Sequence, residues 1–329
     1  MGRRRRAARG VDKISSLPDA ILSRILSLIP TKEAVATSIL SKRWIHLWKS
    51  VDNIDFSKVE VNDAVSNYKF NEFMYSVLVS HVTTRSNFIN SFDLNITYDE
   101  TALASSTFHN ITKWIDLLVQ RRLNHLSLQI HVLDVGCPDV EDYQFKLPVS
   151  IFTCKTLVSL HLCGFHVEGF CFSSIGFGFP SLKTLYLMDI CFHQDRDFML
   201  LLAGCPNLED LAASCIGIQD SRTNSPAIHQ EFKTLSLPKL TRAVISHITD
   251  EECQCYFPVN ALSNSDYLHI QTLKLYTQGL EFYEVSFIMN MMLTTSIYAL
   301  TSTLNIEVVL VSPAHLATFN NSIFLIIID

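Results

Sequence analysis

The sequence contains 12 histidines, nine cysteines and 32 acidic residues, the side chains that most often hold metals or move protons. Their densest local grouping is Cys253 and Cys255, which follow an acidic run at 250–252. Zinc sites use cysteine pairs spaced by at least two residues, usually with a second pair of ligands, and neither feature is present. The pattern predicts a loop at this place, with no metal site and no cofactor.

Catalytic motifs with a recognisable geometry are absent from the sequence. It has no His-Glu-x-x-His zinc motif, no Gly-x-Ser-x-Gly nucleophile turn and no glycine-rich phosphate loop. The nearest approach to such a loop is Gly176-Phe177-Gly178, but aromatic residues flank it and the third glycine is missing. The histidines and carboxylates are too dispersed to suggest an acid–base pair. We therefore predict no catalytic residues and a protein that is not an enzyme.

Residues 14–48 have instead the pattern of a docking module. Two apolar stripes run along the first helix predicted there, one formed by Ile21, Ile25 and Leu28 and the other by Leu22, Leu26 and Ile29. A helix that packs on its own core needs only one such stripe. A unit of about 40 residues is also near the lower limit for closing a core alone. One stripe is therefore predicted to contact a partner, and the spacing leaves open which one.

The ends of three short helices can be predicted in the same segment. Ser16, with an aspartate three residues later, is typical of a capping box, and Pro18 suits a first helical turn. Pro30 should end the first helix. Thr31 is expected to cap a second helix over 32–39, and Ser41 a third. One face of the third helix is predicted to carry Trp44, Leu47 and Trp48.

These residues resemble the F-box, in the version that precedes leucine-rich repeats in plant proteins. The matching strings include Leu17-Pro18-Asp19, Ile25-Leu26-Ser27, Leu40-Ser41-Lys42-Arg43-Trp44 and Leu47-Trp48. The resemblance implies a subunit of an SCF ubiquitin ligase, in which the F-box binds the small adaptor subunit and through it the cullin. The rest of the chain would then select a protein substrate whose binding residues are unknown. The expected adaptor contacts are Leu17, Pro18, Ile21, Ile25, Leu26 and Trp44.

A Leu-x-x-Leu-x-Leu frame recurs six times between residues 123 and 275, as in leucine-rich repeats. The frames begin at Leu123, Leu157, Leu182, Leu208, Leu240 and Ile270. The asparagine that usually follows each frame is replaced by apolar residues, so we expect an irregular α/β solenoid. Cys154, Phe179 and Cys205 occupy one position of the repeat. A position that accepts both cysteine and phenylalanine is predicted to be buried.

The chain divides into five predicted segments: a disordered basic tail at 1–11, the F-box at 12–50, a helix and strand segment at 51–122, repeats at 123–275 and a remnant at 276–329. The segment at 51–122 is predicted to contain helices over 70–81 and 111–119 and a strand over 92–96. His81 lies on the apolar face of the first helix and is predicted to be packed in the core. The remnant contains a strand at 305–311 and an apolar run at 323–328. Because no polar cap follows that run, we expect a truncated product with an exposed edge, and an internal strand paired with the last repeat is the alternative.

Charge is unevenly distributed along the chain. Residues 1–50 contain 11 basic and 3 acidic residues, whereas the remainder contains 15 basic and 29 acidic residues. The acidic body argues against nucleic acid as a partner. The arginines at 3–6 fit a solvated tail, a nuclear-import signal or a weak anionic-surface binder. We predict a nuclear and/or cytoplasmic protein, with cysteines reduced and no membrane partner, since polar residues interrupt the longest apolar run.

Three polar stretches interrupt the repeat frame, at 134–146, 219–233 and 246–265. Insertions in a solenoid often form its binding surface, so these stretches are candidates for substrate contact, and tolerated surface variation is the alternative. Two other functions remain open: an F-box adaptor or scaffold protein that delivers nothing for ubiquitination, and a truncated isoform without substrate delivery.

Overall fold

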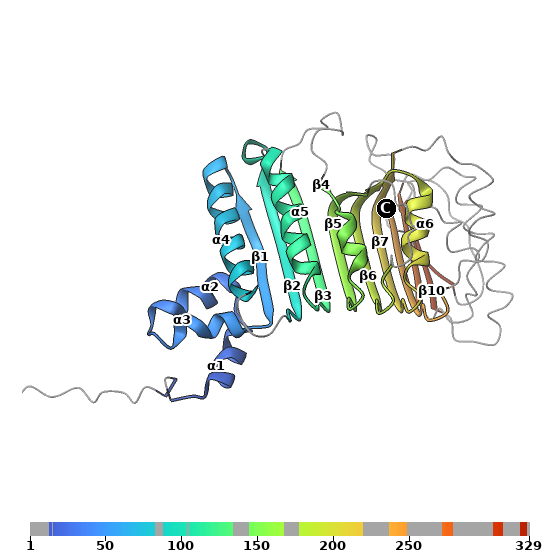
Figure 1. Ribbon diagram of the computed structural model, residues 1–329. Coiled ribbons are helices and arrows are strands. Elements are labelled where there is room, and N and C mark those ends of the chain that lie inside the picture. The colour runs from blue at the N-terminus through green and yellow to red at the C-terminus, as the bar shows by residue number, and fades with distance from the viewer. Residues whose placement is uncertain are drawn as a thin grey trace, which may run out of the picture.

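The structure is a computed structural model, and it shows a mixed helix and sheet protein built on a parallel sheet (Figure 1). The strands follow one another across the sheet in chain order, and the short strand β4 pairs with β5 beside this path. The predicted α/β class is confirmed. The structure describes residues 13–14, 16–82, 88–103, 105–133, 145–167, 178–219, 237–248, 272–278, 305–311 and 323–327.

The bounds of the elements are as follows. The α-helices are α1 (Asp19–Leu26), α2 (Thr31–Ala36), α3 (Trp44–Leu47), α4 (Ala64–Val82), α5 (Ser105–Val119) and α6 (Asp195–Ala203). The 3-10 helices are η1 (Thr37–Ile39), η2 (Trp48–Ser50), η3 (Glu100–Ala102) and η4 (Val149–Thr153). The strands are β1 (Asn53–Val61), β2 (Ser91–Asp99), β3 (His125–Leu133), β4 (Phe145–Lys146), β5 (Ser159–Val167), β6 (Thr184–Phe192), β7 (Asp210–Ile218), β8 (Arg242–Ile248), β9 (Thr272–Gln278), β10 (Asn305–Val311) and β11 (Ile323–Ile327).

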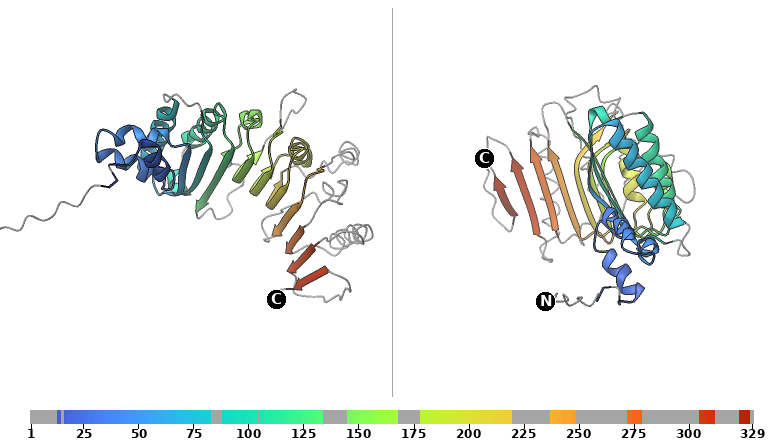
Figure 2. Two further views of the ribbon diagram at one scale, coloured as in Figure 1. Left: turned by 90° about the horizontal axis from the view of Figure 1, so that it is seen from below. Right: turned by 90° about the vertical axis from the view of Figure 1, so that its left-hand side faces the viewer.

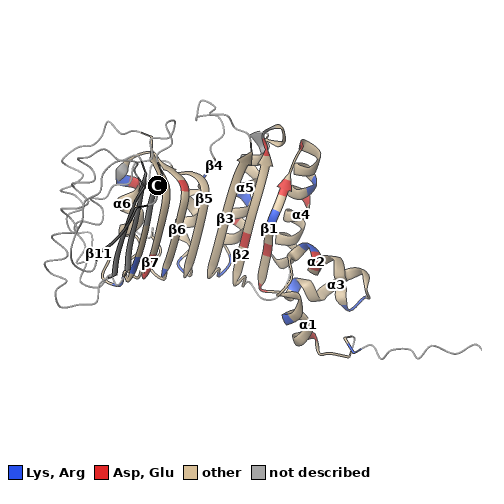
Figure 3. Ribbon diagram, turned by 180° about the vertical axis from the view of Figure 1, so that it is seen from behind, with Lys and Arg blue, Asp and Glu red and all other residues tan. Residues whose placement is uncertain are grey.

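The two faces of the sheet differ. Side chains along β2 alternate strictly, with Phe92, Leu94 and Ile96 buried and the residues between them half-buried. The helices α4, α5 and α6 lie on the side of the buried residues, as both views of Figure 2 show. The opposite side carries no helix among the described residues (Figure 3). We call this side the open sheet face.

The repeat frames predicted from the sequence place equivalent residues side by side. The second position of the frame forms one line across the sheet, in which Leu126 pairs with Leu160, Leu160 with Leu185, and Leu185 with Leu211. These leucines are all buried. Because every frame keeps the same register with its neighbours, one apolar layer runs beneath the strands.

A left-handed residue recurs just after the frame in three neighbouring strands. Gly164, Asp189 and Cys215 all have positive φ angles, of 79°, 51° and 51°. The ladder between β5, β6 and β7 skips these residues and resumes with the next one. Asp and Cys carry a Cβ that disfavours this conformation, whereas glycine adopts it readily. The backbone changes direction here, and the burial of the residues after the frame therefore depends on the left-handed conformation at these three positions.

Helices form within the three predicted segments, but α1 ends at Leu26, before Pro30, and none of the three predicted caps forms, since Arg43 and not Ser41 precedes α3. Ser16 does not cap α1: its hydroxyl donates to the Lys13 carbonyl at 2.7 Å, and Pro18 occupies the cap position. Similarly, Pro30 precedes α2, and the Thr31 hydroxyl accepts a hydrogen bond from the Asp55 backbone N–H at 2.8 Å. Proline fixes its own φ and brings the chain into the helix without a side-chain cap. The Thr31 side chain, which is not used as a cap, instead connects α2 to β1.

Segments flanking the repeats also belong to the sheet. The predicted helices over 70–81 and 111–119 lie within α4 and α5, whereas β1 was missed. The strand predicted at 305–311 is β10, and the final apolar run forms β11, which pairs with β10 in parallel. Among the described residues, no helix is both long enough and apolar enough to cross a membrane.

Candidate docking surfaces

The structure determines which stripe of α1 faces outward. Leu22 and Leu26 are 0% and 1% exposed, and α1 contacts α3 and η2 through this inner stripe. Ile21 and Ile25 remain 46% and 43% exposed, and Leu28 is still more open. The inner stripe therefore closes the module's own core, and the outer stripe remains exposed to solvent.

Further exposed apolar side chains lie in the same N-terminal segment as this outer stripe. They come from the segment before α1, from α1 itself, from the end of the second helical segment and from α3. We call them the outer apolar face: Ile14, Ile21, Ile25, Leu28, Ile39, Leu40 and Ile45. Half of the large apolar side chains that are exposed among the described residues lie in this short segment. Such a concentration is typical of a protein interaction site.

Arg43 holds the beginning of α1 in place beneath this face. Its guanidinium donates from Nε to the Asp19 carboxylate at 2.6 Å and from Nη2 to the Leu17 carbonyl. Two of the strings that carry the F-box resemblance, Leu17-Pro18-Asp19 and the one containing Arg43, are therefore physically connected. An exposed ion pair adds little to the free energy of folding, so its main effect is to fix the orientation of the first turn of α1.

The six predicted adaptor contacts do not form one surface. Pro18 and the outer-stripe pair Ile21 and Ile25 are exposed, and Leu17 is half-buried. The other two, Leu26 and Trp44, are buried, so they support the module from inside. Adaptor contact by any of the six stays a prediction. Leu28 belongs to one of the two stripes found in the sequence but is not among the six contacts. Sequence reasoning missed Ile39 and Leu40, whose exposure follows only from the packing of the short helices against one another.

A joint of two contacts connects this module to α4 and β1. The Trp48 ring meets the edge of the His81 ring, with centroids 5.8 Å apart, and Thr31 accepts from the backbone of β1. His81 is buried, as predicted. Burial, with smaller contributions from Arg121 and Lys49, lowers the pKa of His81 to about 4. The joint thus contains a neutral imidazole at physiological pH.

This depressed pKa predicts a loss of stability in mild acid. The unfolded chain takes up a proton at His81 near its ordinary pKa, whereas the folded chain resists protonation down to about pH 4. Stability from this group is therefore complete above pH 6.5 and falls as the pH drops toward 4. Between about pH 7.5 and 5.5 the expected loss is about 1 kcal/mol. Urea unfolding of the chain and of His81→Phe measures it, because the variant keeps a ring against Trp48 and lacks the proton site. An equal pH dependence in both proteins would contradict the prediction.

The open sheet face presents one continuous line of side chains across seven strands. The strand register makes neighbours of Asp55, Asp93, Ser127, His161, Tyr186, Ala212 and Val244, in that order. We call this line the cross-strand row. It changes from acidic at β1 and β2, through polar and aromatic, to apolar at β7 and β8.

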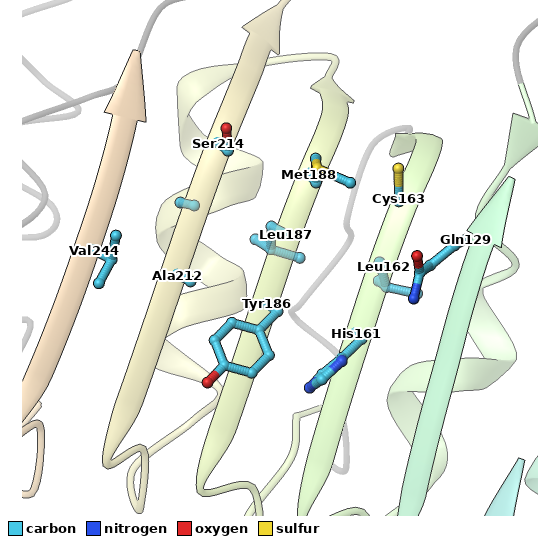
Figure 4. Close-up of a pocket in the computed structure, with 11 residues that line it drawn as sticks. Gln129, His161, Leu162, Cys163, Tyr186, Leu187, Met188, Ala212, Ser214 and Val244 are labelled. Atoms are coloured by element: carbon cyan, nitrogen blue, oxygen red, sulfur yellow. The ribbon is translucent and has the colours of Figure 1, made fainter. Parts of the chain in front are cut away.

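Charged and aromatic groups hold the middle of the row in place. Arg242 donates to both carboxylate oxygens of Asp210, at 2.9 and 2.6 Å, and to the Tyr186 hydroxyl at 2.7 Å. The Tyr186 ring meets the His161 ring edge-on, with centroids 4.4 Å apart (Figure 4). Burial is the largest cause that lowers the pKa of His161. These contacts hold the Tyr186 and His161 rings next to each other on the open sheet face.

A hollow of about 280 Å³ lies along these two rings. Its lining comes from five strands: Gln129, His161, Leu162, Cys163, Tyr186, Leu187, Met188, Ala212, Ala213, Ser214 and Val244. Met188 is 41% exposed although it is apolar. A hollow of this size is below the range of about 300 to 1,000 Å³ that is usual for small-molecule sites. It is large enough for an apolar side chain.

The described cysteines are structural. Cys154, Phe179 and Cys205 are buried, which confirms the prediction for their shared repeat position. Burial raises the pKa of Cys163 and of Cys205 to about 12, so both remain thiols at neutral pH and are weak nucleophiles and metal ligands. No group of three metal-binding side chains occurs in the described part of the chain.

Several predicted features lie wholly or largely outside the described residues. They are the basic tail, Cys253 and Cys255, and most of the three stretches proposed for substrate contact. Gly178 is described, and its φ of 115° brings it against the backbone of Gly204. It therefore serves close packing between two repeats.

Two family models match the chain. Residues 14–56 match the F-box domain, and residues 111–253 match the leucine-rich repeats of "FBD-associated F-box protein At5g56370". The first match covers the whole outer apolar face. The second begins in α5 and includes β3 to β8.

Curated proteins of Arabidopsis thaliana are similar over much of the chain. "F-box/FBD/LRR-repeat protein At1g78750" is 34% identical over 63% of this chain and 43% of its own length. "F-box/LRR-repeat protein 13" is 34% identical over 66% of this chain and 45% of its own length, and "F-box/FBD/LRR-repeat protein At4g00160" is 32% identical over 82% and 53%. The chain spans about half the length of these relatives. The resemblance predicted from the sequence is confirmed: the chain is similar to plant F-box proteins with leucine-rich repeats, with the two matching segments in the same order.

Proposed function

We propose that this chain is the substrate-recognition subunit of an SCF ubiquitin ligase. In this proposal residues 12–50 are a three-helix F-box that binds the small adaptor subunit, which in turn binds the cullin. The sheet and its helices are one side of an irregular leucine-rich solenoid that holds a protein substrate. The chain contributes no catalytic residues, since other subunits transfer ubiquitin, and it acts in the nucleus and/or the cytoplasm.

The outer apolar face is the observation that supports the adaptor contact most strongly. Its side chains are exposed although the inner stripe of the same helix is fully buried. Removing such apolar groups from water on binding is favourable by about 25 cal/mol per Å². Because the Arg43 contacts hold the start of α1 in one direction, little ordering of this helix is needed when a partner binds.

A titration of the purified chain with a plant SCF adaptor subunit tests the proposal. Ile21→Ala combined with Ile25→Ala removes the centre of the outer apolar face. We expect the affinity to fall at least about thirtyfold, since truncating one central anchor commonly costs about 2 kcal/mol. Both residues are exposed and alanine is the better helix former, so folding should be unchanged by circular dichroism.

Two variants control this experiment. Leu133→Ala truncates a side chain of similar exposure at the end of β3 and should leave the affinity unchanged. Leu22→Ala belongs to the inner stripe, so it should lower the free energy of unfolding by about 2–5 kcal/mol. The folded fraction of that variant should still bind the adaptor. Undiminished affinity of the double variant would overturn the proposed docking face.

Cullin recruitment separates the ligase from the scaffold alternative. A ligase subunit should bring cullin into the complex through the adaptor, and the amount of cullin should fall in parallel with adaptor affinity in the double variant. A chain that binds the adaptor but never assembles with cullin would act as a non-ligase F-box scaffold.

A further inference from the structure

The acidic end of the cross-strand row contains a carboxylate with one oxygen that lacks a partner. Asp93 on β2 is paired in register with Asp55 on β1, which places two acidic residues on neighbouring strands of the open sheet face. The Oδ1 oxygen of Asp93 is buried and has no hydrogen-bond partner. A buried acceptor without a donor is destabilising, and a donor supplied by a bound molecule would remove that penalty.

The surroundings of Asp93 favour a positively charged donor. Burial is the largest cause that raises the pKa of Asp93, the nearby Asp55 raises it further, and Ser127 and His161 oppose the shift. One oxygen of the Asp55 carboxylate already accepts a hydrogen bond, from the Ser57 backbone N–H at 2.7 Å. In Figure 3, β1 and β2 carry acidic residues, and β1 also carries the basic residue Lys58. A cation brought to Asp93 would therefore meet a carboxylate with one oxygen still free.

The other end of the row offers an apolar hollow beside fixed rings. Tyr186 is held by Asp210 and Arg242, and His161 stands against it, so the hollow keeps its shape without a ligand. Ala212 and Val244 extend it with small apolar groups, and Met188 reaches over it. An unbranched thioether adapts readily to different apolar partners.

We infer that the cross-strand row binds an extended segment of a partner protein, with a Lys or Arg side chain at Asp93 and a Leu, Met or Phe side chain in the hollow beside Tyr186 and Met188. The inference rests on the proposed function in one respect, because it takes the open sheet face as the surface that holds the substrate. It defines the chemical class of that substrate.

The strand spacing fixes the distance between the two side chains. Asp93 and Tyr186 are separated by three steps across the sheet, from β2 through β3 and β5 to β6. Strands lie about 4.8 Å apart, which makes the span about 14 Å. An extended chain advances about 3.3 Å per residue, so the basic and the apolar residue should be about four positions apart.

Selection of peptides on the whole chain tests this inference. A display library of random linear peptides is the probe, and the immobilised target is the full chain. The enriched peptides are expected to share a basic residue about four positions from Leu, Met or Phe. Asp93→Asn removes the charge with little change of shape, and Met188→Ser removes the apolar cover of the hollow. Each should weaken a selected peptide at least about tenfold by fluorescence anisotropy.

Matched substitutions at the ends of β2 and β3 test whether the peptides bind at the cross-strand row. Asp99→Asn makes the same change at the far end of β2, and Leu133→Ser removes an exposed apolar side chain at the end of β3. Neither should change peptide affinity. Enriched peptides without a basic residue, or peptides that bind Asp93→Asn as tightly as the parent, would overturn the inference.

Adaptor titration of the same variants separates this inference from the proposed function. Asp93→Asn should bind the adaptor normally, because it lies on the face of the sheet and not on the outer apolar face. Loss of peptide binding with adaptor binding intact supports the inference. Selected peptides with the expected pattern, found in a chain that binds no adaptor, would support the surface while contradicting the ligase role.

Discussion

Replacing Gly164 by alanine should lower the free energy of unfolding by about 3 kcal/mol or more, a large part of the 5–15 kcal/mol typical of a domain. A Cβ at this position would collide with the Ile130 carbonyl oxygen on β3, which is backbone and has little room to yield. The φ of 79° adds strain for any residue with a Cβ. Urea unfolding followed by circular dichroism measures the effect.

Gly217→Ala is the matched control for this substitution. Gly217 lies in β7 and its φ is not in the left-handed region; its added Cβ would meet the Cys191 sulfur at 3.6 Å, which is an ordinary contact. The control should therefore stay within about 1 kcal/mol of the parent. Equal stabilities of the two variants would contradict the requirement for glycine at position 164.

The second large effect is expected at Trp114, between α5 and α4. Trp114 is almost fully buried, and its ring meets the Phe70 ring edge-on at 5.8 Å. Trp114→Ala leaves a cavity that backbone elements on both sides prevent from collapsing, so the expected loss is about 3–5 kcal/mol. Thermal unfolding of the purified variant gives the value.

Two further variants show whether this loss comes from the cavity. Trp114→Phe keeps an aromatic edge toward Phe70 and removes the indole N–H, which is buried without an acceptor. It should lose much less stability than the alanine variant. Tyr68→Ala removes an exposed ring from α4 and should change stability by about 0.5 kcal/mol at most. Similar losses for Trp114→Phe and Trp114→Ala would contradict a loss that grows with the size of the cavity.

The repeat part of the fold was largely predictable from the sequence. Leucines at fixed spacing can be buried together only when successive frames lie in register, as Leu160, Leu185 and Leu211 do. The burial of Cys154 and Cys205 followed from the phenylalanine at the equivalent position. The strand β10 was found from its β-branched residues.

Other features could not be read from residue types. Both stripes of α1 are apolar with the same spacing, so only packing against α3 decides that Leu22 is inside and Ile21 outside. Strand β1 escaped prediction because charged residues interrupt its alternation and Lys58 adopts a positive φ where the register shifts. Thr31 looks like a helix cap in sequence, yet its partner is a strand distant in the chain.

The candidate site on the open sheet face was also hidden in the sequence. Asp93, His161 and Tyr186 occupy the outward positions of their strands, where polar residues are expected in any half-buried sheet. Their common function depends on register across strands that are separated by interrupting loops. The sequence shows each of these residues as an ordinary surface position, and only the register shows them as one row.

The agreement between sheet order and chain order has a consequence for synthesis. Along the main path of the sheet, each strand pairs with the one that precedes it in the chain, so a newly made strand finds its partner already in place. The N-terminal helices and β1 leave the ribosome first and need nothing from the later strands for their contact with each other. This end of the chain can therefore fold while the last strands are still being translated.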